Sequence, residues 1–205
     1  FYINQDDSYL LLPSYERKNI SIELTANEFF DLSGHKTYNF KSITDFKEED
    51  FKAAEKIKNF ANNDYRYKVI IGAFRKKYLN KNSSLPTKGN ELVNNNLRVI
   101  WDETSINIES NNKNILKLNS KIVQDIMFKA VWWELIIAQE IAKSIKFKEL
   151  FLGFELNFKS DKNTTKNEID ILINTGKKLI FIECKSGLVK QEDINKMKIV
   201  KQTYG

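Results

Sequence analysis

Two short segments with alternating apolar residues, separated by a turn, restrict the fold of this 205-residue chain more than any other feature. They cover residues 167–173 and 179–185, and the turn between them contains Gly176. Side chains along a strand point alternately to opposite faces of the sheet. Glu183 and Lys185 would therefore share one face, while Ile180, Ile182 and Cys184 would point to the other. The pattern predicts a β-hairpin that has one apolar face and one charged face.

The first strand of this hairpin distributes its charges in the same way. Glu168 and Asp170 would share one face, and the other face would carry Ile169, Ile171 and Ile173. A loop over residues 175–178 sets a register in which Asp170 lies directly opposite Glu183, and Lys185 lies opposite Glu168. Carboxylates directly opposed in a sheet repel each other. We therefore expect a positive charge to hold Asp170 and Glu183 together.

A helical pattern over residues 120–144 precedes the hairpin. Its apolar stripe has three- and four-residue spacing, as in Val123, Met127, Ala130, Ile137 and Ile141. Glu134 stands in the middle of this stripe. A buried charge is costly unless it is paired or bound to a metal. Glu134 is thus a candidate site residue; the alternative is that it pairs with a basic side chain or reaches solvent past Trp132 and Trp133.

The acids of the hairpin indicate metal chemistry. Asp170 and Glu183 offer hard oxygen ligands, which suit Mg²⁺ or Mn²⁺ better than zinc. Such an ion would offset their repulsion and activate water for phosphodiester hydrolysis. Lys185 would orient that water or stabilise the charge of the transition state, and Glu134 would hold the same ion or a second one. The competing interpretation is an edge hairpin with a Glu168–Lys185 ion pair and solvated acids.

An acid on one strand followed by Glu183-Cys184-Lys185 on the next resembles the active site of the PD-(D/E)xK nuclease superfamily. The resemblance implies an α/β (α+β) fold: a restriction-endonuclease-like mixed sheet with flanking helices. It implies Asp170, Glu183, Lys185 and Glu134 as catalytic residues, with Glu134 on the helix before the catalytic sheet. The implied metal ligands are Asp170, Glu183, Glu134 and the backbone carbonyl of Cys184.

Residues 167–187 look, more narrowly, like the CARF-type cyclic-oligoadenylate-activated CRISPR ancillary nucleases. This resemblance implies a cytoplasmic homodimer that acts in type III CRISPR antiviral defence. Cyclic oligoadenylate, bound by a sensor domain outside this sequence, would license cutting of DNA, with RNA as a further candidate substrate. Because the chain starts at Phe1 and stops at Gly205, where the superfamily has one more strand, we expect a trimmed chain that is truncated at its C-terminus.

The patterns divide the chain into two expected units. Residues 1–118 read as a connector with a small winged-helix-like α+β module, and residues 119–205 as the nuclease domain. A capping box at Thr25 predicts a short helix that ends near Gly34. Further helices are expected at residues 47–61, 66–79, 120–144 and 193–204, and strands at 9–12, 20–24, 97–101, 105–109, 115–118 and 150–158.

Composition excludes several classes of site. The formal net charge of +6 modestly favours a polyanionic partner such as nucleic acid. One histidine and one cysteine exclude a multi-histidine or multi-cysteine zinc site and an intramolecular disulfide. His35 is expected to be a solvated turn residue, and Cys184 to fill the core. The Arg75-Lys76-Lys77 run could contact phosphates, although basic residues at a helix end more often complement its dipole.

Two other functions remain open from the residues. One is a restriction, repair or junction DNA endonuclease of the same fold, in which the first unit reads the DNA. The other is a catalytically inactive nucleic-acid-binding module. The presence of Asp170, Glu183 and Lys185 together argues against the inactive module.

Overall fold

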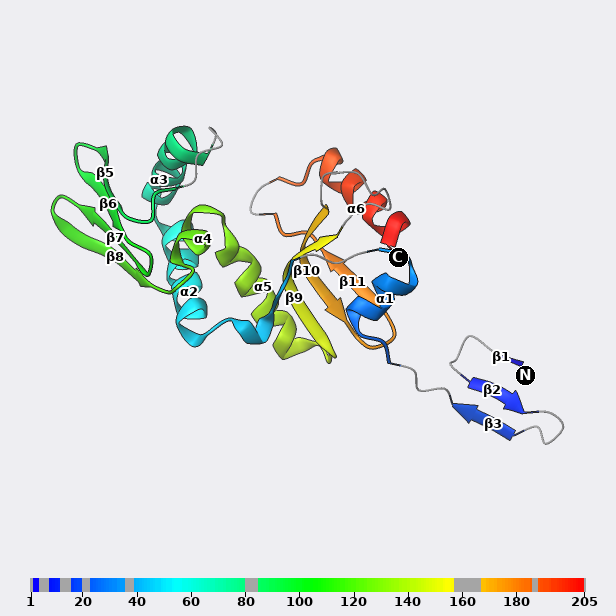
Figure 1. The fold of residues 1–205 in the computed structure, drawn as a ribbon. Coiled ribbons are helices and arrows are strands. Elements are labelled where there is room, and N and C mark those ends of the chain that lie inside the picture. Colours follow the sequence, from blue (N-terminus) through cyan, green and yellow to red (C-terminus); the bar gives the residue numbers. More distant parts are fainter. Residues whose placement is uncertain are drawn as a thin grey trace.

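The computed structural model describes residues 2–3, 8–11, 16–19, 23–35, 39–79, 85–156, 167–185 and 188–204. In these ranges the chain is an α+β protein with two four-stranded antiparallel sheets, flanking helices and a three-stranded N-terminal sheet (Figure 1). The predicted fold class is confirmed in this form. Every strand pairing among the described residues is antiparallel, so the mixed character of the expected sheet is not seen in this part of the chain.

The elements follow one another along the chain as strands and helices. The strands are β1 (Tyr2–Ile3), β2 (Ser8–Leu11), β3 (Glu16–Asn19), β4 (Lys41–Ser42), β5 (Gly89–Asn94), β6 (Leu97–Trp101), β7 (Ser105–Ser110), β8 (Lys113–Asn119), β9 (Glu149–Leu156), β10 (Asn167–Asn174) and β11 (Leu179–Ile182). The helices are α1 (Ala26–Leu32), η1 (Ile43–Asp45), α2 (Glu48–Asn63), α3 (Arg66–Phe74), the π-helical turn η2 (Arg75–Leu79), α4 (Val123–Phe128), α5 (Val131–Ser144) and α6 (Gln191–Tyr204). The predicted strand positions 12, 20–22 and 157–158 lie outside the described residues, and residues 23–24 are described but lie in no strand. Strands β1, β3, β4 and β5 were not predicted.

The sheet that positions the candidate site has the strand order β11-β10-β9-β4. Helix α5 contacts β9 and β10 on one face, while α1 and α6 cover the other (Figure 1). The face toward α5 belongs to the larger hydrophobic cluster, which continues through α2, α3 and α4 to the sheet β5-β6-β7-β8. The opposite face contributes a smaller cluster with Phe30 of α1 and Tyr204 of α6. The sheet is therefore buried on both faces.

The predicted hairpin and its register are confirmed. Ile171 pairs with Ile182 and Ile173 pairs with Ile180. The turn is closed by the Thr175 N–H, which donates to the Lys178 carbonyl at 3.0 Å. Gly176 in this turn has a φ of +89°, which glycine adopts without the steric cost that other residues meet. Extending the ladder by one position places Asp170 opposite Glu183, as the sequence predicts.

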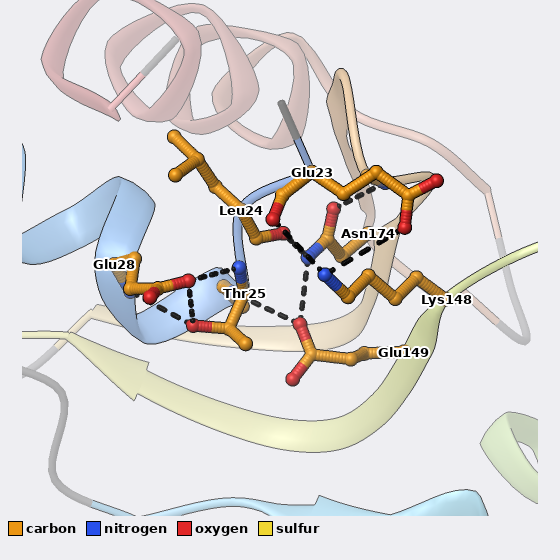
Figure 2. Close-up of polar contacts among 9 residues, drawn as sticks. Glu23, Leu24, Thr25, Glu28, Lys148, Glu149 and Asn174 are labelled. Atoms are coloured by element: carbon orange, nitrogen blue, oxygen red, sulfur yellow. Dashed lines mark hydrogen bonds and ion pairs between the residues drawn. The ribbon is translucent and has the colours of Figure 1, made fainter. Parts of the chain in front are cut away.

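A polar network joins the far end of the hairpin to α1 (Figure 2). Asn174 is fully buried, and its amide nitrogen donates to the Leu24 carbonyl at 2.7 Å and to Glu149 Oε2 at 2.6 Å. The same Glu149 oxygen accepts the N–H of Ala26 at 2.7 Å. Thr25 begins α1 with the predicted capping box to Glu28. These contacts fix the start of α1 against the ends of β9 and β10.

Side-chain alternation shifts by one residue in the middle of β9 and β10. Ile171 packs in the larger cluster, whereas Ile169 packs in the smaller one on the other face. The prediction that Ile169, Ile171 and Ile173 share one face is therefore wrong for Ile169. The shift lies between the pairs Ile169–Phe154 and Ile171–Leu152, where Gly153 has a φ of +58°. A left-handed glycine rotates the strand locally and so changes which face the following side chains occupy.

The single helix predicted over residues 120–144 is two helices. Helix α4 ends at Phe128, and Ala130 has a φ of +63° before α5 begins at Val131. The left-handed backbone at Ala130 interrupts the helix, although no glycine or proline marks the break in the sequence. The helix predicted over residues 66–79 likewise stays α-helical only to Phe74 and continues as the π-helical turn η2.

Segments on both sides of residue 118 contact each other. Strand β4 pairs with β9, α1 packs on the central sheet, and α2 contacts α5. The buried Ser120 hydroxyl donates to Asp50 Oδ1 at 2.5 Å and links the start of α2 to the segment after β8. The division into residues 1–118 and 119–205 stays a prediction. Among the described residues, no helix has the length and apolar character needed to span a bilayer.

Candidate active site

The predicted site residues come from three elements around one end of the hairpin. Asp170 lies on β10, Glu183 and Lys185 follow the last residue of β11, and Glu134 lies in the first turn of α5. The two strands are joined at this point by a side chain, because the N–H of Cys184 donates to Asp170 Oδ2 at 2.6 Å. The turn after β11 is thus held against Asp170.

Glu183 is neutralised by two lysines. Lys185 Nζ lies 2.9 Å from Glu183 Oε1, and Lys196 Nζ of α6 lies 3.0 and 2.9 Å from its two carboxylate oxygens. Lys185 also lies 3.4 Å from Asp193 Oδ1 of α6. The hydrogen bond to Glu183 raises the pKa of Lys185, so this side chain carries its charge throughout the neutral range. The ion pair between Glu168 and Lys185, expected for an edge hairpin without a site, is replaced by these contacts.

Glu134 is a half-buried carboxyl group among other acids. Burial raises its pKa to about 8, and the charges of Asp170, Glu168 and Glu183 add to the shift. The ion pairs of the described residues include none for Glu134, so the predicted alternative of a basic partner is not what the structure places there. At neutral pH this side chain therefore holds a proton.

Asp170 and Cys184 show the same low-polarity surroundings. Burial raises the pKa of Asp170, and the charge of Glu183 adds to this, although the Cys184 N–H opposes it. Burial also raises the pKa of the Cys184 thiol to about 12, with further contributions from Asp170 and Glu134. The thiol packs against the larger hydrophobic cluster, which agrees with its expected role in the core. A thiol in this state is a poor nucleophile.

The acids open into a cleft of about 470 Å³ beside α5. Glu134, Glu168 and Asp170 line it together with Gly153, so the site lies where β9 and β10 exchange faces. Lys41 and Lys129 line the same cleft, and Lys129 lies 2.9 Å from Asp125, a further acid of its lining. A second, more apolar groove of about 840 Å³ reaches Glu183 and Lys185 from the side of β11 and α6. Glu134, Glu168 and Asp170 thus line one opening, and Glu183 and Lys185 line the other.

The carboxylates of the site are ligands of the type that a hard divalent cation prefers, but their side chains are not close enough together to bind one. Carboxylates that repel each other and retain protons when buried are what a bound cation would neutralise. In the part of the chain that the structure describes, however, no three acidic, cysteine or histidine side chains are close enough to hold a metal together. Glu183 instead faces the ammonium groups of Lys185 and Lys196, and the raised pKa of Glu134 keeps that carboxyl protonated at neutral pH.

Sequence reasoning missed Lys196 and Asp193 as neighbours of the site. Their signal was available in the helical pattern of α6, because residues three apart lie on one side of a helix. His35 was predicted to be solvated and is instead buried, with an exposed fraction of 2%. Its Nε2 donates to the Thr203 carbonyl at 3.1 Å, and its ring meets Tyr204 edge-on at 4.6 Å. Lys77 from the predicted basic run pairs with Glu91 of β5 at 2.5 Å.

Comparisons with known proteins identify similar folds. No family model matches the chain, and no curated protein matches it. Can2 from Sulfobacillus thermosulfidooxidans, solved in complex with cyclic tetra-adenylate, has a TM-score of 0.56 at 15% identity, over 100% of this chain and 55% of that one. Protein VC1899 from Vibrio cholerae has a TM-score of 0.59 at 10% identity, over 99% of this chain and 56% of that one. The chain thus spans little more than half the length of these proteins, and the likeness concerns the fold.

Proposed function

We propose that this chain carries the catalytic part of a divalent-metal-dependent endonuclease that hydrolyses phosphodiester bonds in DNA, with RNA as a further candidate substrate. The observation that carries the proposal is the convergence of Asp170, Glu183 and Lys185 at one end of a hairpin, beside the half-buried Glu134. Structural proteins rarely gather several carboxylates in a partly buried cleft, because each one raises the cost of ionising the others.

Mg²⁺ or Mn²⁺ would be held by Asp170, Glu183, Glu134 and the backbone carbonyl of Cys184, and when bound would activate water and polarise the phosphate. Lys185 presents a cation beside these acids, suited to orient water or to offset negative charge on the phosphate. Glu134 carries a proton at neutral pH, and it would lose this proton when a cation binds beside it. Cys184 positions Asp170 through its backbone N–H.

The proposal extends to the biological setting of the site. The fold is shared with Can2, which was solved with cyclic tetra-adenylate. Together with the resemblance of residues 167–187, this supports an effector of type III CRISPR antiviral defence, acting as a cytoplasmic homodimer. Cyclic oligoadenylate would act through a domain outside this sequence, because the chain covers only 55% of Can2.

The test is cleavage of single-stranded DNA, RNA and supercoiled plasmid with Mg²⁺ or Mn²⁺, with and without cyclic tetra-adenylate. Asp170→Asn, Glu183→Gln and Lys185→Ala should each lower the cleavage rate by at least about a hundredfold. Circular dichroism should show that these variants remain folded. Glu192→Gln, which changes an exposed acid of α6, is the matched control and should cleave like wild type.

The outcomes separate the candidate functions. Cleavage that survives any of the three site substitutions would overturn the assignment of that residue. Sequence-specific cleavage without any nucleotide activator would favour a restriction, repair or junction endonuclease. Binding of nucleic acid that needs no divalent metal, without cleavage, would indicate an inactive binding module.

A further inference from the structure

Lys196 forms an ion pair with Glu183, whose carboxylate is a ligand in the proposed metal site. Its Nζ lies 3.0 and 2.9 Å from Glu183 Oε1 and Oε2, so both oxygens face one ammonium group. The Glu183 side chain is only 8% exposed. Water therefore screens this ion pair less than it screens a pair on the open surface. The Lys196 side chain itself is 40% exposed, so the buried partner of the pair is Glu183.

Helix α6 fixes where Lys196 can reach. Val200 and Tyr204 bury one side of the helix against the central sheet, with exposed fractions of 1% and 6%. Asp193, one turn before Lys196, lies 3.4 Å from Lys185. Helix α6 thus presents an acid to the catalytic lysine and a lysine to the catalytic acid. Lys196 is held at the site by a packed helix.

The two lysines at Glu183 are not equivalent. Lys185 has a second acid, Asp193, and would keep a partner if it left Glu183. Among the described residues, the ion pairs of Lys196 involve Glu183 alone. A divalent cation that uses a Glu183 oxygen must share a carboxylate already enclosed by ammonium protons, and like charges at such distances repel strongly. Binding of the cation and seating of Lys196 on Glu183 therefore oppose each other.

We propose that Lys196 is a resident counter-ion that competes with the divalent cation for Glu183 and thereby sets the metal affinity of the site. The proposal rests on the proposed function in one respect, namely that Glu183 is a metal ligand. It adds that α6 determines how readily the site is loaded: any displacement of the helix that withdraws Lys196 favours metal binding. Lys196 is thus a positioning residue that acts through Glu183.

The test is titration of metal-free protein with Mn²⁺ by calorimetry, without nucleic acid. Lys196→Met should bind Mn²⁺ about five- to tenfold more tightly than wild type, because a competing ion pair is removed. Lys198→Met removes the same charge from the same helix at a residue that lines the neighbouring groove, and should change the affinity less than about twofold. Adding Glu183→Gln to Lys196→Met should abolish the gain.

Each result decides one question. An affinity of Lys196→Met equal to that of Lys198→Met, or weaker than wild type, overturns the competition. A gain that persists in the double variant shows that the effect does not pass through Glu183, and overturns it as well. Absence of Mn²⁺ binding in wild type and in Lys196→Met alike overturns the proposed function itself. Lys196→Gln keeps the measurement possible if the methionine variant does not fold.

Discussion

Glu134 is an ionisable group on a helix that otherwise supplies apolar side chains to the core. Helix α5 buries Trp132, Leu135, Ile136 and Ala138, and it carries Glu134 toward the cleft among other acids. Its pKa of about 8 follows first from burial and then from Asp170. A side chain that keeps a proton at neutral pH couples the stability of the fold to pH.

We expect Glu134→Gln to stabilise the metal-free protein at alkaline pH. Below pH 4.5 the carboxyl is protonated in both the folded and the unfolded chain, so it contributes no difference. Between pH 4.5 and about 8 the unfolded chain has lost the proton that the folded chain keeps, so the free energy of unfolding falls as pH rises. Above pH 8 the variant should be more stable by on the order of 3 kcal/mol. Urea unfolding with chelator at pH 5 and pH 8.5 measures this.

Glu140→Gln is the matched control for this experiment. Glu140 lies on the same helix, is exposed, and pairs with Lys143 at 2.8 Å. Its hydrogen bond to Lys143 lowers its pKa, so it does not oppose folding at alkaline pH. Equal pH dependence of wild type and Glu134→Gln would show that Glu134 ionises freely in the folded protein.

The hairpin and its register could be predicted from the sequence because both depend on residues that are close together in the chain. Alternation and the length of the loop are enough to set the register that opposes Asp170 and Glu183. The face of Ile169 could not be read in this way, since it depends on the backbone at Gly153 on a different strand. His35 was misjudged for a related reason. A glycine turn indicates solvent, but the burial of His35 comes from α6, far along the chain.

At the scale of elements, Gly153 determines how β9 and β10 present the site. We expect Gly153→Ala to lower the free energy of unfolding by about 1 to 2 kcal/mol, because an L-residue resists a left-handed φ. Sterics contribute little, since an added Cβ would meet only Glu168 Oε1 at 3.8 Å. Cleavage should fall as well, because the strand shift beside Asp170 is disturbed. Urea unfolding and the cleavage assay measure the two effects.

Gly72→Ala is the same chemical change as Gly153→Ala, but it should raise the free energy of unfolding instead of lowering it. Gly72 lies inside α3, and an added Cβ would meet no atom within 4 Å. Alanine should raise the free energy of unfolding by roughly 0.5 to 1 kcal/mol through its helix propensity. If both alanine variants shift stability in the same direction, the strain assigned to Gly153 is wrong.

The break between α4 and α5 shows what sequence periodicity cannot decide. The apolar stripe of residues 120–144 continues across the break, so spacing alone predicts one helix. Ala130, with its left-handed φ, lies between two helices that both contact α2, and such tertiary packing can override local helix propensity. The break sets the first turn of α5, and with it the direction of Glu134.

At the scale of the whole molecule, Asn174 connects segments that are far apart in the sequence. Asn174→Ala should lower the free energy of unfolding by about 2 to 3 kcal/mol, because the Leu24 carbonyl and Glu149 each lose a buried partner. Thermal unfolding followed by circular dichroism measures the loss. Asn90→Ala, at an exposed position of β5, should stay within about 0.5 kcal/mol of wild type.

The result for Asn174 also bears on the two-unit division at residue 118. If α1 belongs to the folding unit of the central sheet, Asn174→Ala should shift one cooperative transition that includes both. A separate early transition, with the rest of the unfolding curve unchanged, would place the N-terminal segment outside that unit. The sequence could not predict this link, because Leu24 and Asn174 are joined only by the folded chain.

The chain contains a single cysteine, Cys184, which lies between Glu183 and Lys185. With a thiol pKa of about 12, Cys184 is almost wholly unreactive toward alkylating reagents at pH 8 while the protein is folded. Any event that loosens the turn after β11 would expose a faster-reacting sulfur. The rate at which Cys184 is labelled therefore measures how often this turn opens, and the measurement requires no engineered probe.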